Sequence, residues 1–241
     1  MNPRRVIALC IAQAALLAWA APAWAQAPEG RNYTPGAFDA IEISGGAIVR
    51  FAQGDVDQVF VEGDDATQRA VTLEARDGLL TVHTRGGWKF WKSQRLQLVI
   101  TARELKRLTI SGAADFTAAP VQARKLSVEI SGAGLARFEL LKADELRFTV
   151  SGSGDGHVAG SVNQLSVSIS GRSDFNGENL MSQRAKVAIS GLGHAKVWAQ
   201  QDLAIAISGI GTVDHWGSAN VKRSTSGLAT INDRGARPAP P

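Results

Sequence analysis

The fold of this chain can be predicted from the segment Leu126-Ser-Val-Glu-Ile-Ser-Gly-Ala-Gly-Leu-Ala-Arg-Phe138. From Leu126 to Ile130 apolar residues alternate with polar ones, which is the period-2 pattern of a strand with one buried face. Ser131-Gly132 interrupts the alternation, and it resumes from Gly134 to Phe138. This stretch therefore predicts two short strands joined by a tight corner.

The Ser-Gly corner recurs along the chain at nearly constant intervals of 18 to 20 residues. Its glycines are Gly112, Gly132, Gly152, Gly171, Gly191, Gly209 and Gly227. A period this short is one turn of a stacked coil rather than one globular domain. Glycine permits the positive φ or the close backbone approach that such a corner needs. The serines are expected to bond to backbone groups and to form a hydroxyl column with a spacing of about 4.8 Å.

The repeat predicts an all-β fold, a right-handed parallel β-solenoid (β-helix) with turns of about 20 residues. Each turn has one strand rich in large aliphatic residues and one that opens with glycine or alanine. Two facing sheets of this kind fill a thin core without voids. An antiparallel sandwich also has short strands and frequent turns. A sandwich, however, gives no reason for one corner motif at one spacing.

The repeat also divides the chain into segments. Residues 102–233 are the Ser-Gly repeat solenoid, and residues 38–101 keep the period-2 pattern without the regular corners. We interpret residues 38–101 as an N-terminal β cap with irregular turns, because an open end would expose core and a strand edge. Residues 26–37 are expected to be a lead-in linker and residues 234–241 a disordered tail. Only Gly63–Ala70 and Arg103–Arg107 could form a turn of helix.

The first 25 residues have the features of a Sec-type signal peptide. Arg4 and Arg5 precede an apolar run, and Ala23-Trp-Ala25 provides the small residues of a cleavage site before Gln26. Cleavage would remove Cys10, the only cysteine, so the mature chain would have no thiol or disulfide. It would also leave 24 of the 26 basic residues against 22 acidic ones. The chain is thus expected to be exported to the periplasm, the outer surface or the medium, with no transmembrane segment and no nucleic-acid partner.

Several motifs resemble a known bacterial family. Ile-Ser-Gly-x-Gly occurs at 130–134, 189–193 and 207–211, and Val-Ser-Gly-Ser-Gly-Asp occurs at 150–155. Together with the opening segment from Phe38 onward, these motifs resemble DUF2807, the putative auto-transporter adhesin head GIN domain, over residues 38 to 232. The resemblance implies an exported β-solenoid with no established catalytic residues. It also implies an adhesion-type role.

The most unusual local sequence is Trp88-Lys89-Phe90-Trp91-Lys92. Three aromatic and two basic side chains could stack on sugar rings or lie at an anionic surface. Alternatively, the aromatic rings plug one end of the solenoid while the lysine ammonium groups remain in water. We take this loop as the candidate partner-binding loop, with end-plugging as its structural alternative.

Three aspartates follow their corner glycines at the same distance, namely Asp115, Asp155 and Asp174. They are expected to share one outward column, with Asp155 and Asp174 on successive turns. Two such carboxylates could bind Ca²⁺ or act as an acid–base pair, but aspartate beside glycine is usually a turn former. His157 and His194 are expected about 10 Å apart, too far to share a zinc ion.

These features favour a non-enzymatic envelope or surface module with no cofactor and no metal. Its partner would be an envelope protein or a glycan. A carbohydrate-active enzyme that uses the outward carboxylates is the alternative, and a purely structural envelope protein is a third possibility. The enzyme hypothesis predicts Asp155 and Asp174 in a cleft with convergent basic side chains.

Overall fold

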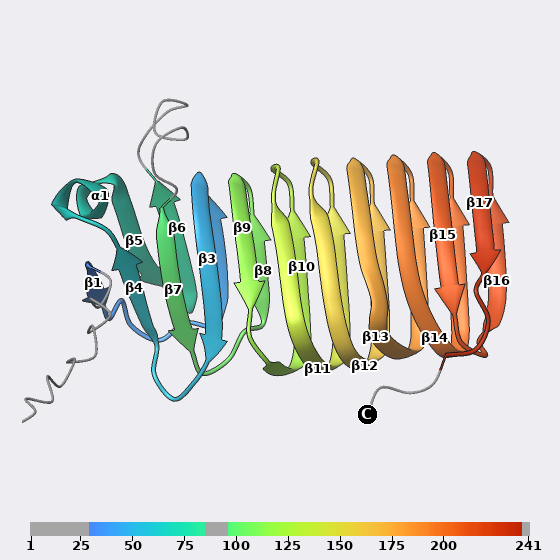
Figure 1. Ribbon diagram of the computed structural model, residues 1–241, viewed down its shortest axis with the longest axis horizontal. Coiled ribbons are helices and arrows are strands. Elements are labelled where there is room, and N and C mark those ends of the chain that lie inside the picture. The colour runs from blue at the N-terminus through green and yellow to red at the C-terminus, as the bar shows by residue number, and fades with distance from the viewer. Residues whose placement is uncertain (1–28, 85–95, 238–241) are drawn as a thin grey trace, which may run out of the picture.

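The computed structural model of the protein describes residues 29–84 and 96–237, and it shows a long, flattened β-solenoid (Figure 1). Its strands form one continuous 17-stranded sheet that winds around a narrow core. The predicted all-β solenoid is confirmed, and the antiparallel sandwich is wrong because the repeated turns pair in parallel. No helix in the described residues has the length and apolar character needed to cross a bilayer.

Each regular turn consists of two walls joined at two edges. In β11 (Leu135–Val150), residues 135–138 pair with β9 (Ala113–Ala118), whereas residues 141–150 pair with β10 (Val121–Ile130). We call the sheet face that contains residues 135–138 and β9 wall A, and the sheet face that contains residues 141–150 and β10 wall B. The long strand itself bends between the two walls, and we call this side of the solenoid the bend edge. The Ser-Gly corners form the opposite edge. In Figure 1 the Ser-Gly edge lies at the top and the bend edge at the bottom. The pattern repeats in β12 (Asp155–Ile169), β13 (Arg172–Ile189) and β14 (Leu192–Ile207).

The core follows the alternation of the sequence. Phe116 and Phe138, on wall A of successive turns, lie with ring centroids 5.8 Å apart, and Phe148 and Phe175 lie 5.1 Å apart. A Cβ atom on Gly156 would approach Cζ of Phe148 to 2.4 Å. Large side chains of one wall thus fill the space left by small ones of the other, as the repeat predicted.

The corner glycines are required by close stacking and not by a left-handed backbone. None of the seven has a positive φ. A Cβ on Gly132 would lie 1.9 Å from the carbonyl oxygen of Gly112, in the turn below. Several of the corner serine hydroxyls bond to backbone groups, as expected. Those of Ser170 and Ser190 donate to the carbonyl oxygens of Val150 and Ile169 in the preceding turn, at 3.3 and 3.5 Å.

The N-terminal part closes one end of the solenoid. Strands β2 (Ala40–Ser44) and β3 (Gly46–Gln53) lie between the pair β8 (Arg107–Ile110) and β9 and the pair β6 (Leu79–Thr84) and β7 (Gln97–Ala102). Antiparallel strands then cover the outermost turn, namely β4 (Gln58–Glu62) on β7 and β5 (Val71–Arg76) on β6. The turn formed by β2 and β3 therefore comes first in the sequence but second in the stack, because the later strands β6 and β7 form the outermost turn.

Two short elements flank this cap. Residues Gly30–Tyr33, which we assigned to a linker, form strand β1 and pair antiparallel with β4, because β4 otherwise has an open edge. The helix α1 (Asp65–Ala70) forms inside the predicted stretch, and its N-terminus is capped by Asp64, which accepts the Thr67 N–H at 2.9 Å. Residues 103–106 form no helix and lead into β8.

The C-terminal turns comprise β15 (Ile210–Trp216), β16 (Asn220–Thr225) and β17 (Leu228–Asp233). Strand β16 pairs in parallel with β14, and β17 pairs in parallel with β15. The opposite edges of β16 and β17 have no partner within the described residues. This end therefore differs from the covered N-terminal end.

Candidate functional site

The predicted aspartate column is present on the outside of wall A. Asp115 and Asp155 both lie in register with Leu135, and Asp174 follows Asp155 on the next turn. An Asp155 carboxylate oxygen accepts the backbone N–H of Asp174 at 3.0 Å. Asp155 thus links its own turn to the next one, which is a structural role but not the local backbone bond of a turn-forming aspartate. The described residues include no cluster of three or more His, Cys, Asp or Glu side chains suited to a metal ion.

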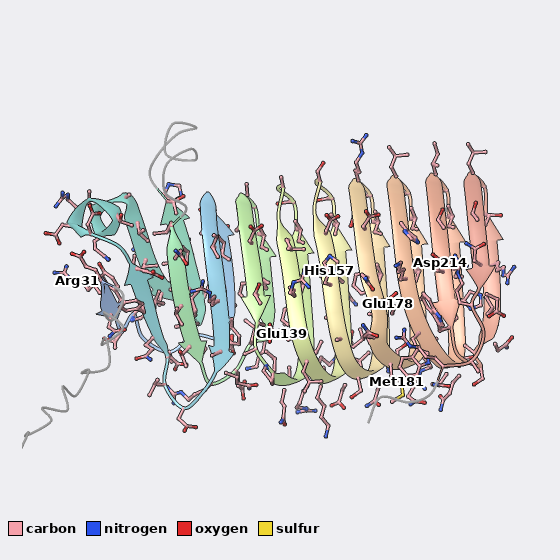
Figure 2. All side chains as sticks on the ribbon, in the orientation of Figure 1. Arg31, Glu139, His157, Glu178, Met181 and Asp214 are labelled. Atoms are coloured by element: carbon pink, nitrogen blue, oxygen red, sulfur yellow. The ribbon has the colours of Figure 1, made fainter. Side chains whose placement is uncertain are left out.

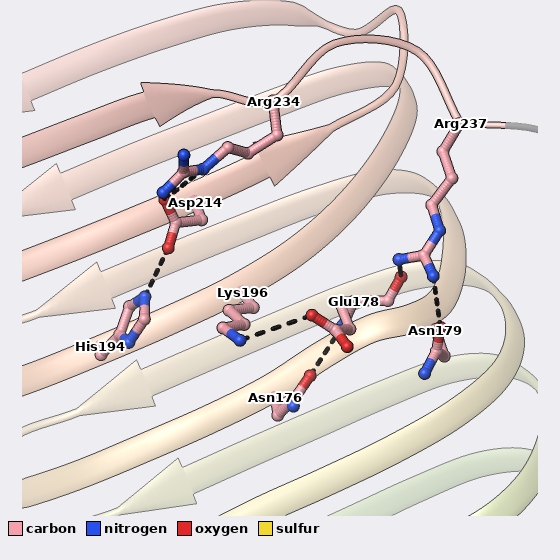
Figure 3. Close-up of polar contacts among 8 residues, drawn as sticks. All are labelled: Asn176, Glu178, Asn179, His194, Lys196, Asp214, Arg234 and Arg237. Carbon is pink, nitrogen blue, oxygen red and sulfur yellow. Dashed lines mark hydrogen bonds and ion pairs between the residues drawn. The ribbon is translucent and has the colours of Figure 1, made fainter.

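The same column continues into a polar network that sequence reasoning missed. His194 lies in register with Asp174, and its Nε2 donates to Oδ2 of Asp214 at 2.7 Å. Asp214 also accepts bonds from Asn232 and Arg234, both at 2.9 Å. Figure 3 shows the bonds of Asp214 with His194 and Arg234. Although it points outward from the sheet, Asp214 is only 4% exposed. Its partners lie on the turns before and after its own, so the 18- to 20-residue register brings them together.

Burial by itself would raise the pKa of Asp214, but the bonds from Asn232, His194 and Arg234 outweigh it and hold the pKa at about 2. Neighbouring His215 points inward and has a buried Nε2 without a hydrogen-bond partner. Burial lowers the pKa of His215, opposed by Asp233 and assisted by Arg223. Both groups thus keep the charge state, anionic for Asp214 and neutral for His215, that their surroundings favour at neutral pH.

The depressed pKa of Asp214 predicts an acid-dependent contribution to stability. A carboxyl whose folded pKa lies below its ordinary value of 3.8 stabilises the fold fully above that value, and this stabilisation is lost as pH falls from about 4 to about 2. The change Asp214→Asn should therefore lower the free energy of unfolding at pH 7 by about 2 kcal/mol. Urea unfolding of both proteins at pH 7, 4, 3 and 2 should show the difference shrinking below pH 4. A difference that stays constant with pH would contradict this role of the carboxylate.

The residues after β17 fold back across the solenoid. We define Arg234–Arg237 as the C-terminal strap. The backbone N–H of Arg234 donates to the carbonyl oxygen of His215 in β15 at 2.9 Å. The N–H of Gly217, directly after β15, donates to the carbonyl oxygen of Gly235 at 3.0 Å. Arg237 reaches β13, where its guanidinium donates to the Glu178 carbonyl at 2.7 Å and to Asn179 Oδ1 at 2.8 Å (Figure 3). We expected these residues in a disordered tail. The structure corrects this for 234–237, because their polar groups find hydrogen-bond partners on two earlier turns, those of β13 and β15.

Arg237 also explains the burial of an outward tryptophan. Its guanidinium carbon lies 5.8 Å from the ring centroid of Trp198 and 5.9 Å from that of Trp216, which are in register on adjacent turns. Such cation–π contacts contribute about 0.5–2 kcal/mol. Trp198 is only 2% exposed. The strap therefore fixes the last turns and covers a surface that would otherwise be aromatic.

A groove of about 1200 Å³ runs along the bend edge over β10 to β13. We call it the bend groove; its lining residues come from 103–106, 122–127, 142–147, 161–163, 181 and 183, together with Gln53. A shallower continuation of about 410 Å³ reaches Gln201 on β14. Figure 2 shows long polar side chains projecting from this edge and labels Met181 there. The groove was not predicted, although side chains 18 to 20 residues apart could have been read as neighbours.

The candidate residues of the sequence analysis lie elsewhere. Asp115, Asp155 and Asp174 are on wall A and are absent from the lining of the bend groove. His157 is in register with Asn176 and is not paired with His194. The loop Trp88-Lys89-Phe90-Trp91-Lys92 lies outside the described residues, so its role as a plug or a binding loop stays a prediction.

This geometry defines a parallel β-solenoid with an N-terminal cap, and comparison with known proteins places it in a family. Residues 37–219 match the family DUF2807, described as "Putative auto-transporter adhesin, head GIN domain", and the chain belongs to it. A comparison with the curated proteins finds no similar sequence.

Solved structures share the fold at low sequence identity. A putative adhesin from Bacteroides fragilis is 18% identical, with a TM-score of 0.75 over 88% of this chain and 98% of that one. A putative adhesin from Parabacteroides distasonis is also 18% identical, with a TM-score of 0.66 over 87% and 96%. A putative lipid binding protein from the same species is 19% identical, with a TM-score of 0.64 over 89% and 98%. At this identity the likeness concerns the fold alone.

Proposed function

We propose that this chain is an exported, non-enzymatic binding module of the bacterial cell envelope or surface, and that the bend groove holds its partner. The adhesin description of its family and the signal-like residues 1–25 support this proposal. The observation that carries it is the groove itself, which crosses successive turns at the bend edge.

The regular stacking of the turns suits the groove to an extended partner. Its walls are rows of side chains in register, for example Lys125 with Glu145 and Gln164 with Arg184. Successive members of a row are separated by the strand spacing of about 4.8 Å. A partner that lies along the solenoid would therefore meet a side chain of the row at each turn, at a constant spacing. This is the way in which solenoid surfaces bind elongated partners.

The geometry gives less support to a carbohydrate-active enzyme. That hypothesis requires Asp155 and Asp174 in a cleft with convergent basic groups, and neither aspartate lines the bend groove or its continuation. Asp155 is instead bonded to the backbone of the next turn. We therefore retain the binding module and not the enzyme.

The test compares binding by three purified proteins to a panel of envelope glycans and envelope proteins. The groove variant is Arg124→Glu/Lys142→Glu, whose residues line the groove and are exposed. The control variant is Arg137→Glu/Arg172→Glu, which makes the same change of charge at exposed residues outside the groove. We expect at least one partner that the wild type and the control bind and the groove variant loses. The proposal would be refuted if the wild type bound no partner, or if the groove variant bound every partner as tightly as the wild type does.

The aromatic loop can be tested in the same panel. A Trp88→Ala/Trp91→Ala variant should bind normally if the rings only plug the end of the solenoid. A loss of binding equal to that of the groove variant would instead assign the partner to the loop.

A further inference from the structure

The charges that line the bend groove are not balanced. Six lining residues are basic and three are acidic. The acidic groups already have partners: Glu104 pairs with Lys106 at 3.0 Å, and Glu145 pairs with Lys125 at 3.1 Å. The third, Asp144, accepts a bond from the amide of Asn163 at 3.0 Å. The three carboxylates of the groove are therefore already bonded to other side chains of the protein.

Two cations of the groove have no such partner among the described residues. Arg124 and Lys142 are exposed and lie on neighbouring turns, β10 and β11. Arg147 adds a third positive charge that contacts Glu145 only at 3.8 Å. These side chains form a positive stretch across the turns, and it suits a ligand with negative charges at intervals.

Uncharged amides continue the groove toward the C-terminal end. Asn163, Gln164, Gln183 and Gln201 line the continuation over β12 to β14. An amide side chain both donates and accepts hydrogen bonds, which matches hydroxyl groups that do the same. A ligand that presents hydroxyls as well as acid groups would use both parts of the groove.

The floor of the groove distinguishes a glycan from a polypeptide. It is formed by short side chains such as Ala123, Ala143 and Val162. Protein partners bind mainly through large aromatic or arginine anchors that enter deep pockets. A floor of short side chains provides no large anchors of this kind from the groove side, whereas a chain of polar rings can lie along it.

From these observations we infer that the ligand of the bend groove is an acidic polysaccharide, bound along the solenoid axis. Its carboxylates contact Arg124, Lys142 and Arg147, and its hydroxyls contact the amide row. This inference rests on the proposed function and specifies its partner.

The test uses the purified protein with polygalacturonate as the probe and dextran of equal length as the neutral comparison. We expect polygalacturonate to bind at least about tenfold more tightly than dextran, and binding to weaken about tenfold between 50 and 300 mM NaCl because exposed charges are screened. Arg124→Glu/Lys142→Glu should weaken binding about tenfold or more. Arg137→Glu/Arg172→Glu should leave it within about twofold.

Two further arms separate the sources of negative charge. Gln164→Ala/Gln183→Ala should weaken polygalacturonate binding about threefold and leave polyacrylate binding unchanged, since polyacrylate has carboxylates but no hydroxyls or peptide groups. Tighter groove-dependent binding of polyglutamate, or of phosphatidylglycerol vesicles, would overturn the inference in favour of an acidic protein or a membrane. Groove-dependent binding of a neutral partner in the panel would overturn it while the proposed function stands. If no partner depends on the groove, both are wrong.

Discussion

Replacement of Gly171 by alanine is expected to destabilise the protein by about 3 kcal/mol or more, because the new methyl group has no space. Its Cβ would lie 1.8 Å from the carbonyl oxygen of Gly152 in the preceding turn. That oxygen accepts the Arg172 N–H at 3.0 Å, so moving it also breaks a bond between turns. The obstacle is the backbone of the preceding turn, so it cannot be relieved by a rotamer change. Chemical unfolding followed by circular dichroism measures the loss.

The matched control for this change is Ser170→Ala at the same corner. It removes only the hydroxyl that donates to Val150 at 3.3 Å, a bond that contributes about 0.5–1.5 kcal/mol. We therefore expect a clear gap between the two variants. Equal losses would mean that the corner tolerates a side chain, and that stacking distance does not explain the recurrence of glycine.

The repeat made the scaffold predictable because each turn satisfies its own local rules. Alternation from Leu126 to Ile130 specifies which side chains face the core, and the corner glycines specify the period. The pairing of Phe148 with Gly156 also follows from the pattern of large and small residues. The sequence does not reveal why glycine is needed at the corners, because a positive φ and a close backbone approach both require it. The structure shows that the close approach is the reason.

The contacts that depend on distant turns were not predictable in the same way. Residues 234–237 have the composition of a free tail, yet Arg237 finds Glu178 and Asn179 some 58 residues earlier. Asp214 reads as an outward exception in its own turn and is buried by Asn232 and Arg234. Once the register between turns is known, rows such as Lys125 and Glu145 can be read from the sequence. The groove could then be found.

The last turn differs from the others at its inward positions, and this difference has a predicted effect on assembly. Arg223 and Thr225 of β16 lie in register with Ile205 and Ile207 of β14, which point into the core. Inward-pointing charge on an edge strand is a known means of preventing edge-to-edge pairing. The polar residues of β16 thus make its open edge a poor partner for a second copy.

The variant Arg223→Ile/Thr225→Val restores the apolar pattern of β14 on the edge strand. Each aliphatic side chain buried between two copies would contribute about 1.5–3 kcal/mol, so the association constant should rise on the order of a hundredfold or more. Sedimentation velocity over a range of protein concentrations should show larger species than the wild type forms. Added salt should not reverse the association, because its source is apolar burial.

The control places similar apolar side chains on the opposite face of the same strand. Lys222→Ile/Ser224→Val alters outward positions, in register with Ala204 and Ala206 of β14. If this variant associates as strongly as Arg223→Ile/Thr225→Val, surface hydrophobicity alone is responsible, and the inward charge of β16 does not guard the edge. Association of the inward variant alone would show that Arg223 and Thr225 keep this end of the solenoid from pairing.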